Sequence, residues 1–278
     1  MRSVNMRHAL VLAAVAPIAW QTPALAQDPP RLPLWELGAF AVGVSQQAYP
    51  GADQQVQRGL ALPYLVYRGE LLRADRGSAA LRAIKTSRFE LDIGVAGSFG
   101  SNADAIEARR GMPDLGTLVE FGPRLKWNLG DALGGRWRME LPVRGVFDLN
   151  DGLARRGVAV EPKLGFERRA KGGWFYSASV SAIIGDRRLG DTFYGVAPRY
   201  ALTSRPAYSA KSGLIAGRLQ AELTYRPTPD WRLFGFGRID SVSGAANEAS
   251  PLVRRTSGAS VGLGVAYTWR RSERLAAD

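Results

Sequence analysis

The fold class is decided by residues 119–129, which read VEFGPRLKWNL. Every second residue from Val119 to Leu129 is apolar, and the intervening positions include Glu120, Arg124 and Lys126. A period of two places these two sets on opposite faces of a β-strand, whereas a helical period would scatter the charges around a cylinder. The stretch therefore predicts a strand with one apolar face and one ionic face.

The same alternation recurs along the chain, and turn signals separate the repeats. Strands of this kind are expected at 89–95, 137–143, 158–166, 215–225 and 261–269. Clusters of Gly, Asn, Asp and Pro predict turns at 128–131, 134–135, 150–152, 171–173 and 227–230. Longer connections at 98–116 and 185–213 alternate with these short turns, which is typical of outer-membrane barrels. We expect one all-β domain of about twelve strands, with ten as the alternative.

The ionic residues in the middle of strands favour a closed antiparallel transmembrane β-barrel with a wet interior. Aromatic residues near strand ends predict girdles at the two membrane interfaces: Trp127, Trp137, Trp174, Tyr176, Tyr225, Trp231, Tyr267 and Trp269. A soluble β-sandwich also alternates and is the competing fold. Pro123 and Pro142 are expected at bulges or near strand ends, because proline cannot donate to a ladder.

Residues 1–26 resemble a secretory signal peptide. Arg2 and Arg7 give a positive start, residues 9–19 are mostly apolar, and Ala24-Leu25-Ala26 forms a cleavage site before Gln27. The competing interpretation is a buried N-terminal helix. We predict a signal peptide at 1–26, a barrel domain at 27–278 and a location in the cell outer membrane.

The composition excludes several kinds of chemistry. His8 lies within the predicted signal peptide and is the only histidine of the sequence, which has no cysteine. Nucleophilic schemes that need His or Cys, and zinc sites built on them, are therefore excluded from the mature chain. Pairs of acids such as Asp186 with Asp191, or Glu90 with Asp92, carry no further mark of catalysis. We expect no enzyme, no cofactor and no metal.

The chain is basic, and the charge predicts anionic surroundings. Its net charge is +12, and loss of Arg2 and Arg7 with the signal peptide would leave +10. Outer-membrane lipid and lipopolysaccharide are expected partners, and nucleic acid is not, because export removes the protein from it. The cations are also dispersed among acids rather than grouped in runs.

Two loop segments carry candidate contacts for lipopolysaccharide, murein or a partner protein. Arg205 and Lys211 flank Tyr208, and cations beside a ring suit a sugar or a phosphate. Tyr49 and Asp53 belong to a turn, residues 49–53, that contains Pro and Gly. The competing interpretations are a strand-joining turn at 49–53 and a rim loop in which Tyr208 packs and Arg205 pairs with an acid.

The charged faces of the strands are expected to line the lumen: Glu90, Asp92, Glu120, Arg124, Lys126, Arg138, Glu140, Arg144, Glu161, Lys163 and Glu167. Cross-strand pairs are expected between Arg124 or Lys126 and Glu140, and between Arg138 or Arg144 and Glu161. A network of this kind would fill a narrow lumen, and a selective pore is the alternative.

Four motifs in order resemble the MipA/OmpV family of outer-membrane proteins, over about Trp35 to Trp269. They are YPGAD with LPY (49–53, 62–64), GD with FYGV (185–186, 193–196), RPAYSAKSG (205–213) and SPLV (250–253). One departure is the charged tail 270–278, since barrels of this kind usually end on the aromatic residue of the last strand.

The resemblance implies a non-enzymatic scaffold. Members of this family are described as holding a lytic transglycosylase near a murein synthase, and others are linked to permeability, osmotic response or adhesion. We therefore expect a binding protein for murein-processing enzymes in the periplasm, with a narrow or gated outer-membrane pore as the alternative. The family offers no catalytic residues to carry over.

Overall fold

The computed structural model describes residues 33–68, 72–75, 78–86 and 88–276, so the predicted signal peptide lies outside the described residues. The strands are β1 (Trp35–Gln47), β2 (Gln55–Arg68), β3 (Leu72–Asp75), β4 (Ser78–Lys85), β5 (Phe89–Ser98), β6 (Leu118–Ala132), β7 (Gly135–Asp148), β8 (Ala154–Val160), β9 (Lys163–Arg169), β10 (Trp174–Gly185), β11 (Gly213–Tyr225), β12 (Trp231–Ser241) and β13 (Ser257–Arg271). The helices are α1 (Arg187–Tyr194) and the 3₁₀ turns η1 (Glu107–Arg109), η2 (Leu149–Asp151), η3 (Lys171–Gly173) and η4 (Pro198–Tyr200).

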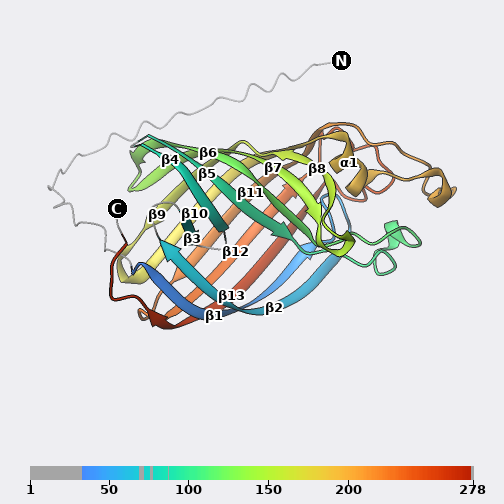
Figure 1. Ribbon diagram of the computed structural model, residues 1–278. Coiled ribbons are helices and arrows are strands. Elements are labelled where there is room, and N and C mark those ends of the chain that lie inside the picture. Colours follow the sequence, from blue (N-terminus) through green and yellow to red (C-terminus); the bar gives the residue numbers. More distant parts are fainter. Residues whose placement is uncertain (1–32, 69–71, 76–77, 87, 277–278) are drawn as a thin grey trace, which may run out of the picture. The chain divides into compact units, whose positions relative to one another are not determined.

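The strands form one antiparallel sheet that closes on itself (Figure 1). Neighbours in sequence are neighbours in the sheet, β1 pairs with β13, and β10 pairs with β11. β8 and β9 occupy one position in the wall, because each pairs with β7 on one side and β10 on the other. The thirteen labelled strands therefore make twelve positions, and the predicted twelve-stranded barrel is confirmed.

The outer face of the sheet is apolar and exposed. Leu263 is 75% exposed, and Val180 and Leu219 are 55% exposed. A continuous band of such residues is unfavourable in water and is what lipid requires of a barrel. A sandwich would bury one face of each sheet between two layers. The closed sheet instead turns this face outward, so the sandwich interpretation is wrong.

None of the helices among the described residues is long and apolar enough to cross a membrane.

The turn predicted at 128–131 is wrong, because this segment lies inside a strand. The register between β6 and β7 shifts between Asn128 and Gly130, where Gly130 has φ of +105°, and β6 continues to Ala132. The extra residue makes a bulge rather than a reversal. The chain reverses at Leu133 and Gly134, with φ of +57° and +73°, next to the turn predicted at 134–135. Two successive positive φ values match a tight two-residue hairpin.

The two prolines within strands do not lie where they were expected. Pro123 lies in the middle of β6, opposite Ile93, and Pro142 lies in the middle of β7, opposite Arg124. Neither lies at a bulge or a strand end. The hydrogen-bonded ladder between β6 and β7 skips from Phe121 to Arg124 without a change of register. The N–H group that Pro123 lacks is therefore not needed there, because the two strands are not paired at this point.

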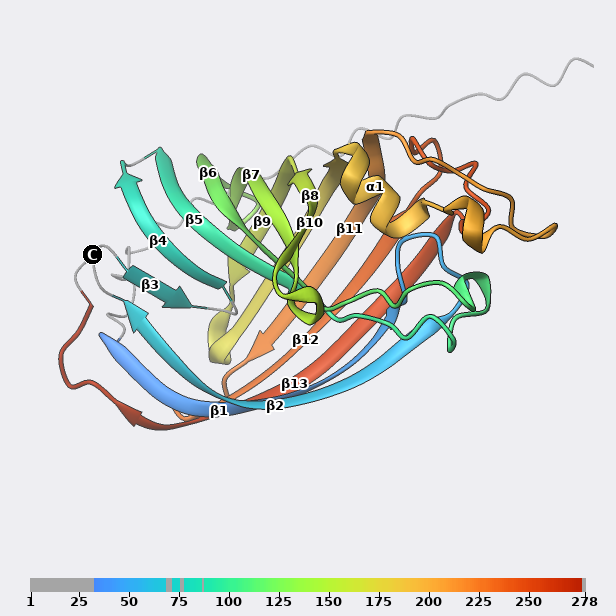
Figure 2. The ribbon, with the colours of Figure 1, turned by 45° about the vertical axis from the view of Figure 1, so that its right-hand side comes forward.

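The connections differ sharply between the two ends of the barrel (Figure 2). The connections at one end, here called the loop end, comprise residues 48–54, 99–117, 149–153, 186–212 and 242–256, and most of them are long. Short turns at the other end, the turn end, comprise 86–88, 133–134, 170–173 and 226–230. The start of β1 and the end of β13 also lie at the turn end. The long connections predicted around 98–116 and 185–213 are confirmed, and the loop at 242–256 was not predicted.

All eight aromatic residues predicted for the girdles lie at the turn end. They belong to the ends of β6, β11 and β13 and to the starts of β7, β10 and β12. Rings contact each other across strands, with centroids 4.3 Å apart for Trp174 and Tyr225 and 4.8 Å apart for Trp231 and Tyr267. The structure therefore has one marked girdle from these residues, where two were expected.

Candidate functional site: the loop cap and the inner wall

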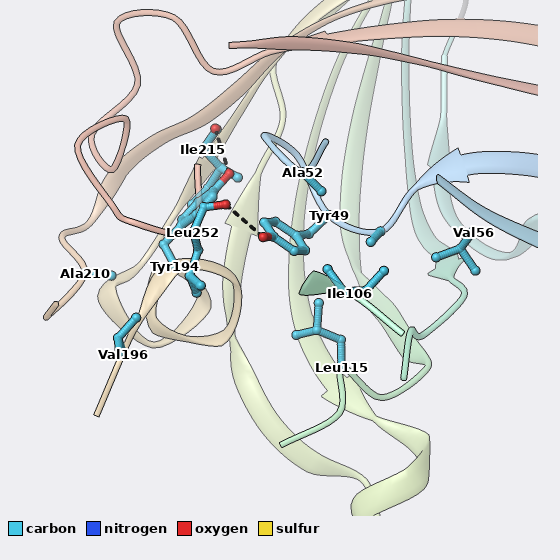
Figure 3. Close-up of a cluster of buried hydrophobic side chains, with 11 residues drawn as sticks. Tyr49, Ala52, Val56, Ile106, Leu115, Tyr194, Val196, Ala210, Ile215 and Leu252 are labelled. Atoms are coloured by element: carbon cyan, nitrogen blue, oxygen red, sulfur yellow. Dashed lines mark hydrogen bonds between the residues drawn. The ribbon is translucent and has the colours of Figure 1, made fainter. Parts of the chain in front are cut away.

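Four of the long loops meet in a single buried cluster, which we call the loop cap (Figure 3). Its buried members are Ala48, Tyr49, Ala52, Val56, Ile106, Leu115, Tyr194, Val196, Ala210, Ile215 and Leu252. These residues come from connections rooted at β1/β2, β5/β6, β10/β11 and β12/β13, which are distributed around the closed sheet. Loops rooted on opposite sides can share one core only by crossing the mouth between them. The loop cap therefore spans the loop end of the barrel.

Two buried tyrosines hold the loop cap together. The Tyr49 hydroxyl donates to the carbonyl oxygen of Leu252 at 2.8 Å, and the Tyr194 hydroxyl donates to that of Pro50 at 3.1 Å. Both side chains are almost fully buried, at 2% and 1% exposure. Burial raises the pKa of Tyr49 to about 12 and also raises the pKa of Tyr194. Both phenols therefore stay neutral and serve as hydrogen-bond donors.

Arg205 joins two loops through carbonyl oxygens. Its Nη1 donates to the carbonyls of Ala108 and Arg110, both at 3.0 Å, and its Nη2 donates to that of Tyr200 at 2.8 Å. Only 7% of the residue is exposed. A planar guanidinium can satisfy several backbone acceptors at once, which a lysine cannot do. Arg205 therefore links two loops of the loop cap. Its hydrogen-bond partners are carbonyl oxygens and not the acid that was expected.

Arg109 plays a similar part beneath Tyr49. Its guanidinium lies 5.8 Å from the centroid of the Tyr49 ring and donates to the carbonyls of Phe193 and Pro113. Burial lowers the pKa of Arg109. Tyr49 and Arg205, two of the predicted contact residues, thus both contact the loop between β5 and β6, although they belong to different sequence motifs.

The other three predicted contact residues lie at the edge of the loop cap. The side chain of Asn247 accepts from the Tyr208 hydroxyl at 3.3 Å and from the Lys211 backbone at 2.8 Å. Lys211 itself is exposed, so its ammonium group remains accessible. Asp53 lies 3.9 Å from Arg254 at the surface. The five residues therefore do not form one ligand-binding cluster.

Sequence reasoning missed Arg109, Tyr194 and Asn247. Each is polar, lies in a long loop, and is more than nine-tenths buried. Their partners are mostly backbone carbonyls distant in sequence, which a local motif does not reveal. The Phe-Tyr-Gly-Val motif at 193–196 was noticed, but its pattern did not indicate that the tyrosine enters a core.

Most of the predicted lumen charges form ion pairs on the face opposite the exposed apolar residues. Arg124 makes a two-pronged contact with Asp92 at 2.8 and 2.9 Å, and Lys126 lies 2.6 Å from Asp92 and 3.2 Å from Glu90. Asp92 is only 1% exposed. Charge-assisted, two-pronged contacts of this kind are strong and directional. They tie β5 to β6.

A second group surrounds the break between β8 and β9. Arg144 contacts Glu161 and lies 3.0 Å from Glu120, and Ser181 donates to Glu161 at 2.9 Å. Lys163 lies 3.7 Å from Glu161. The break itself does not open the wall, because the Glu161 backbone donates to Pro142 and Ala182 donates to Pro162.

The expected pairings are correct for Arg144 with Glu161 and wrong for the others. Arg124 takes its acid from β5, because the register places Asp92 directly opposite it, whereas Pro142 is its neighbour on β7. Lys126 lies opposite Glu90 on β5 and Glu140 on β7, and its ion pairs are with Glu90 and Asp92. Arg138 contacts Glu167 rather than Glu161. The register of β7 against β9 places Arg136 opposite Glu167, which brings Arg138 within reach of the same acid on the inner face.

A third group was not predicted. Arg218 on β11 lies 2.6 Å from Asp240 on β12, and Arg238 lies 3.2 Å from the same acid. Asp240 is 3% exposed. Ionic contacts thus follow the inner wall from β5 to β12 as an ionic belt, in which the buried acids Asp92, Glu161 and Asp240 are each contacted by two basic residues.

Within the described part of the chain, three or more His, Cys, Asp or Glu side chains never gather as a metal site would require. The acids Asp186 and Asp191 each have a structural partner. Asp186 caps α1 by accepting from the Leu189 backbone at 2.9 Å, and Asp191 accepts from the Ala210 backbone at 2.8 Å.

The sequence profile of the family described as MltA-interacting protein MipA matches residues 37–269. No curated protein sequence matches the chain.

Solved structures similar to the chain include outer-membrane barrels of several kinds. A NanC porin is 12% identical, with 84% of this chain and 98% of the porin covered and a TM-score of 0.37. An outer membrane channel from Pseudomonas putida F1 is 13% identical, with 87% and 100% covered and a TM-score of 0.46. Outer membrane phospholipase A from Escherichia coli is 12% identical, with 85% and 94% covered and a TM-score of 0.35.

Proposed function

Because the chain belongs to the family of the MltA-interacting protein MipA, we propose that it is a non-enzymatic outer-membrane scaffold for a murein-processing enzyme. The partner is a lytic transglycosylase of the MltA type, with a murein synthase as a second component of the assembly. Short turns of such barrels face the periplasm and long loops face outward. Murein lies in the periplasm, so the partner would dock at the turn end.

One observation carries this proposal: the turn end is strongly basic. The described residues there include nine cations, Arg88, Arg136, Arg168, Arg169, Lys171, Arg226, Arg270, Arg271 and Arg274, and four acids, Glu36, Asp131, Asp230 and Glu273. Two of these acids are engaged by Arg136 and Arg271. A surface of one sign steers a partner of the opposite sign and sets its orientation. We call this surface the basic rim and assign the partner an acidic docking face.

The scaffold is tested by reversing charge at the basic rim. Arg168 and Lys171 are both exposed and adjacent to the β9–β10 turn, so R168E/K171E should fold normally. The intact chain in lipid nanodiscs is mixed with a purified lytic transglycosylase, and the dissociation constant is measured at low and at physiological salt. We expect the double variant to bind at least tenfold more weakly, and binding of the unaltered protein to weaken as salt rises.

The matched control is R254E/R255E, which reverses two exposed charges at the loop end. Binding of this variant should equal that of the unaltered protein. Equal loss in both double variants, or no loss in R168E/K171E, would contradict docking at the basic rim. Absence of any complex at low salt would contradict the scaffold itself.

The alternative of a narrow or gated pore makes a different prediction in planar bilayers. The loop cap and the ionic belt support a barrel without steady conductance. We therefore expect no stable conductance steps from the intact chain. Regular steps that vanish when the loop cap is cross-linked would favour the pore over the scaffold.

Export through the cleaved signal peptide belongs to the same proposal. The mature protein recovered from outer membranes should begin at Gln27, as measured by the intact mass of the chain. A chain that retains residues 1–26 would contradict this part.

A further inference from the structure

Four arginines line one recess at the loop end. The recess has a volume of about 770 Å³ and is lined by Ala154, Arg155, Arg156, Arg187, Arg188, Asp191 and Thr192. It lies where the start of β8 meets α1, and the Thr192 hydroxyl lies 3.5 Å from the Arg156 carbonyl oxygen across that junction. Its volume is in the range of sites for small organic ligands rather than of a lone inorganic ion.

The charge of the recess is poorly compensated. Arg156 is held by Asp148 at 2.7 Å and by Asp151 at 2.9 Å, and Arg187 lies 3.8 Å from Asp191. Within the portion of the chain that the structure describes, Arg155 and Arg188 have no acid partner, and both are exposed. The guanidinium groups of Arg155 and Arg188 are therefore available to a ligand, whereas those of Arg156 and Arg187 contact acids of the protein.

The scaffold around the recess is rigid enough to present these groups. α1 is capped by Asp186, and Leu189 on its opposite side is buried against Val146 and Ala159. Gly157 of β8 has φ of +140°, and a β-carbon there would collide with Asp186. This close approach fixes α1 against β8, so Arg187 and Arg188 face the recess from a packed helix rather than from a free loop.

The position of Arg155 relates the recess to the membrane. Arg155 is paired across strands with Phe147, so the two side chains share a face of the sheet. The Phe147 ring stacks on Phe121 with centroids 4.8 Å apart, and Phe121 is 47% exposed on the apolar outer face. Arg155 therefore projects from the outer face of the sheet near its loop end, whereas α1 packs on the inner-face residues Val146 and Ala159, so the recess lies at the rim of the wall.

We propose that this recess binds the phosphorylated headgroup of the glycolipid that forms the outer leaflet, with Arg155 and Arg188 contacting phosphate. Guanidinium groups match phosphate oxygens in pairs, and basic pockets at the membrane boundary bind anionic lipid headgroups. The site is separate from the basic rim and from the residues 205–211 that the sequence suggested for lipopolysaccharide. It is also independent of the scaffold function.

The test measures binding to the full mature chain in a neutral detergent by native mass spectrometry. Lipid A bearing two phosphates is compared with fully dephosphorylated lipid A and with inorganic phosphate. We expect lipid A to bind, dephosphorylated lipid A to bind at least tenfold more weakly, and inorganic phosphate to compete only at far higher concentration. Equal binding of both lipids would overturn the proposal, and so would inorganic phosphate binding as tightly as lipid A, which would indicate a free-phosphate site.

Variants of Arg155 and Arg188 test whether lipid A binds in the recess. R155Q/R188Q should weaken binding of lipid A at least roughly tenfold, and R155K/R188K should retain part of it, because lysine keeps charge without the planar fork. R254Q/R255Q removes the same charge from another loop and should bind normally. Heat-modifiable migration in gels verifies that each variant is folded. Unchanged binding in R155Q/R188Q, or an equal loss in R254Q/R255Q, would overturn the assignment.

Discussion

Arg205 and Arg109 stabilise the loop cap although neither guanidinium group is paired with a carboxylate. Both are buried, and each donates to at least one backbone carbonyl of another loop. Loops carry many carbonyls that have no partner within a ladder, and leaving them buried and unpaired is costly. Two guanidinium forks satisfy several of these acceptors and hold the loops together.

Replacing Arg205 by Ala should therefore loosen the loop cap. The carbonyls of Ala108, Arg110 and Tyr200 would lose their donors, and we expect the free energy of unfolding to fall by about 3 kcal/mol. R255A removes an exposed arginine from a neighbouring loop and should change it by no more than about 0.5 kcal/mol. Urea unfolding in lipid vesicles gives both values, and equal effects of the two variants would contradict the role assigned to Arg205.

The buried phenol of Tyr49 predicts a dependence on alkaline pH. Its pKa is about 12 in the folded chain against 10.0 for a free tyrosine side chain, so its contribution to stability is complete below pH 10 and is lost as the pH rises through 12. We expect the loops to become sensitive to protease across this interval while the strands remain protected. Y49F cannot ionise and should show less of this sensitivity. Identical pH profiles for the two proteins would exclude Tyr49 as the cause.

The sequence identifies Tyr49 and Arg205 as notable residues but not what they do. Their motif context suggests a ligand contact, because a cation beside a ring is a common ligand-binding arrangement. The Arg205 side chain instead contacts the carbonyl of Ala108, 97 residues away in the chain. Such partners depend on how four loops fold over one mouth, which no local pattern specifies. The recess at Arg155 was missed for the same reason, since it joins a strand to a distant helix.

At the scale of the elements, the period of two predicts strands well where the two faces differ in chemistry. β5, β6, β7, β11 and β13 follow it. β1 and β2 are harder to recognise, because both of their faces carry apolar residues. Phe40 and Leu62 lie directly opposite each other on the face that carries Tyr64. Other strands carry charges on that face. With apolar residues on both faces the contrast disappears. The bulge at Asn128–Gly130 was mistaken for a turn because glycine serves both.

The ionic belt predicts a large effect from one acid. Asp240 holds both Arg218 and Arg238, so D240N would leave two inner-wall cations without a carboxylate. Breaking a buried ion pair from one side is costly, and we expect the free energy of unfolding to fall by about 3 kcal/mol. D230N removes an exposed acid at the turn end and should cost no more than about 1 kcal/mol. A D240N protein as stable as D230N would show that the belt contributes little to folding.

A charged substitution on the outer face of β13 should lower the free energy of unfolding, and the loss should depend on how deep the residue lies in the membrane. Leu263 lies in the middle of the strand and is 75% exposed, so L263R would place a cation in hydrocarbon at a cost of about 2–4 kcal/mol. Leu202 is 57% exposed in a loop, and L202R should be tolerated. The two free energies of unfolding, measured in the same vesicles, give the comparison. An equal cost would indicate that Leu263 does not face lipid.

At the scale of the whole molecule, the described barrel has two unlike ends. The loop end has a buried core of its own and an arginine-lined recess, and the turn end has a girdle of aromatic rings and the basic rim. The sequence predicts the closed sheet, the strand number and the asymmetry of loop lengths. It does not predict that the aromatic residues gather at one end, because strand direction decides which ends meet.

The most direct test of this architecture is a spin-label scan of β13 in lipid vesicles. The chain has no cysteine, so single cysteines can be introduced at 261–268 and labelled. We expect labels at 261, 263, 265 and 267 to collide with oxygen dissolved in lipid, and labels at 262, 264, 266 and 268 to be shielded from it. Access of a water-soluble nickel complex to both sets, in a protein that remains dissolved without detergent, would contradict a lipid-embedded barrel.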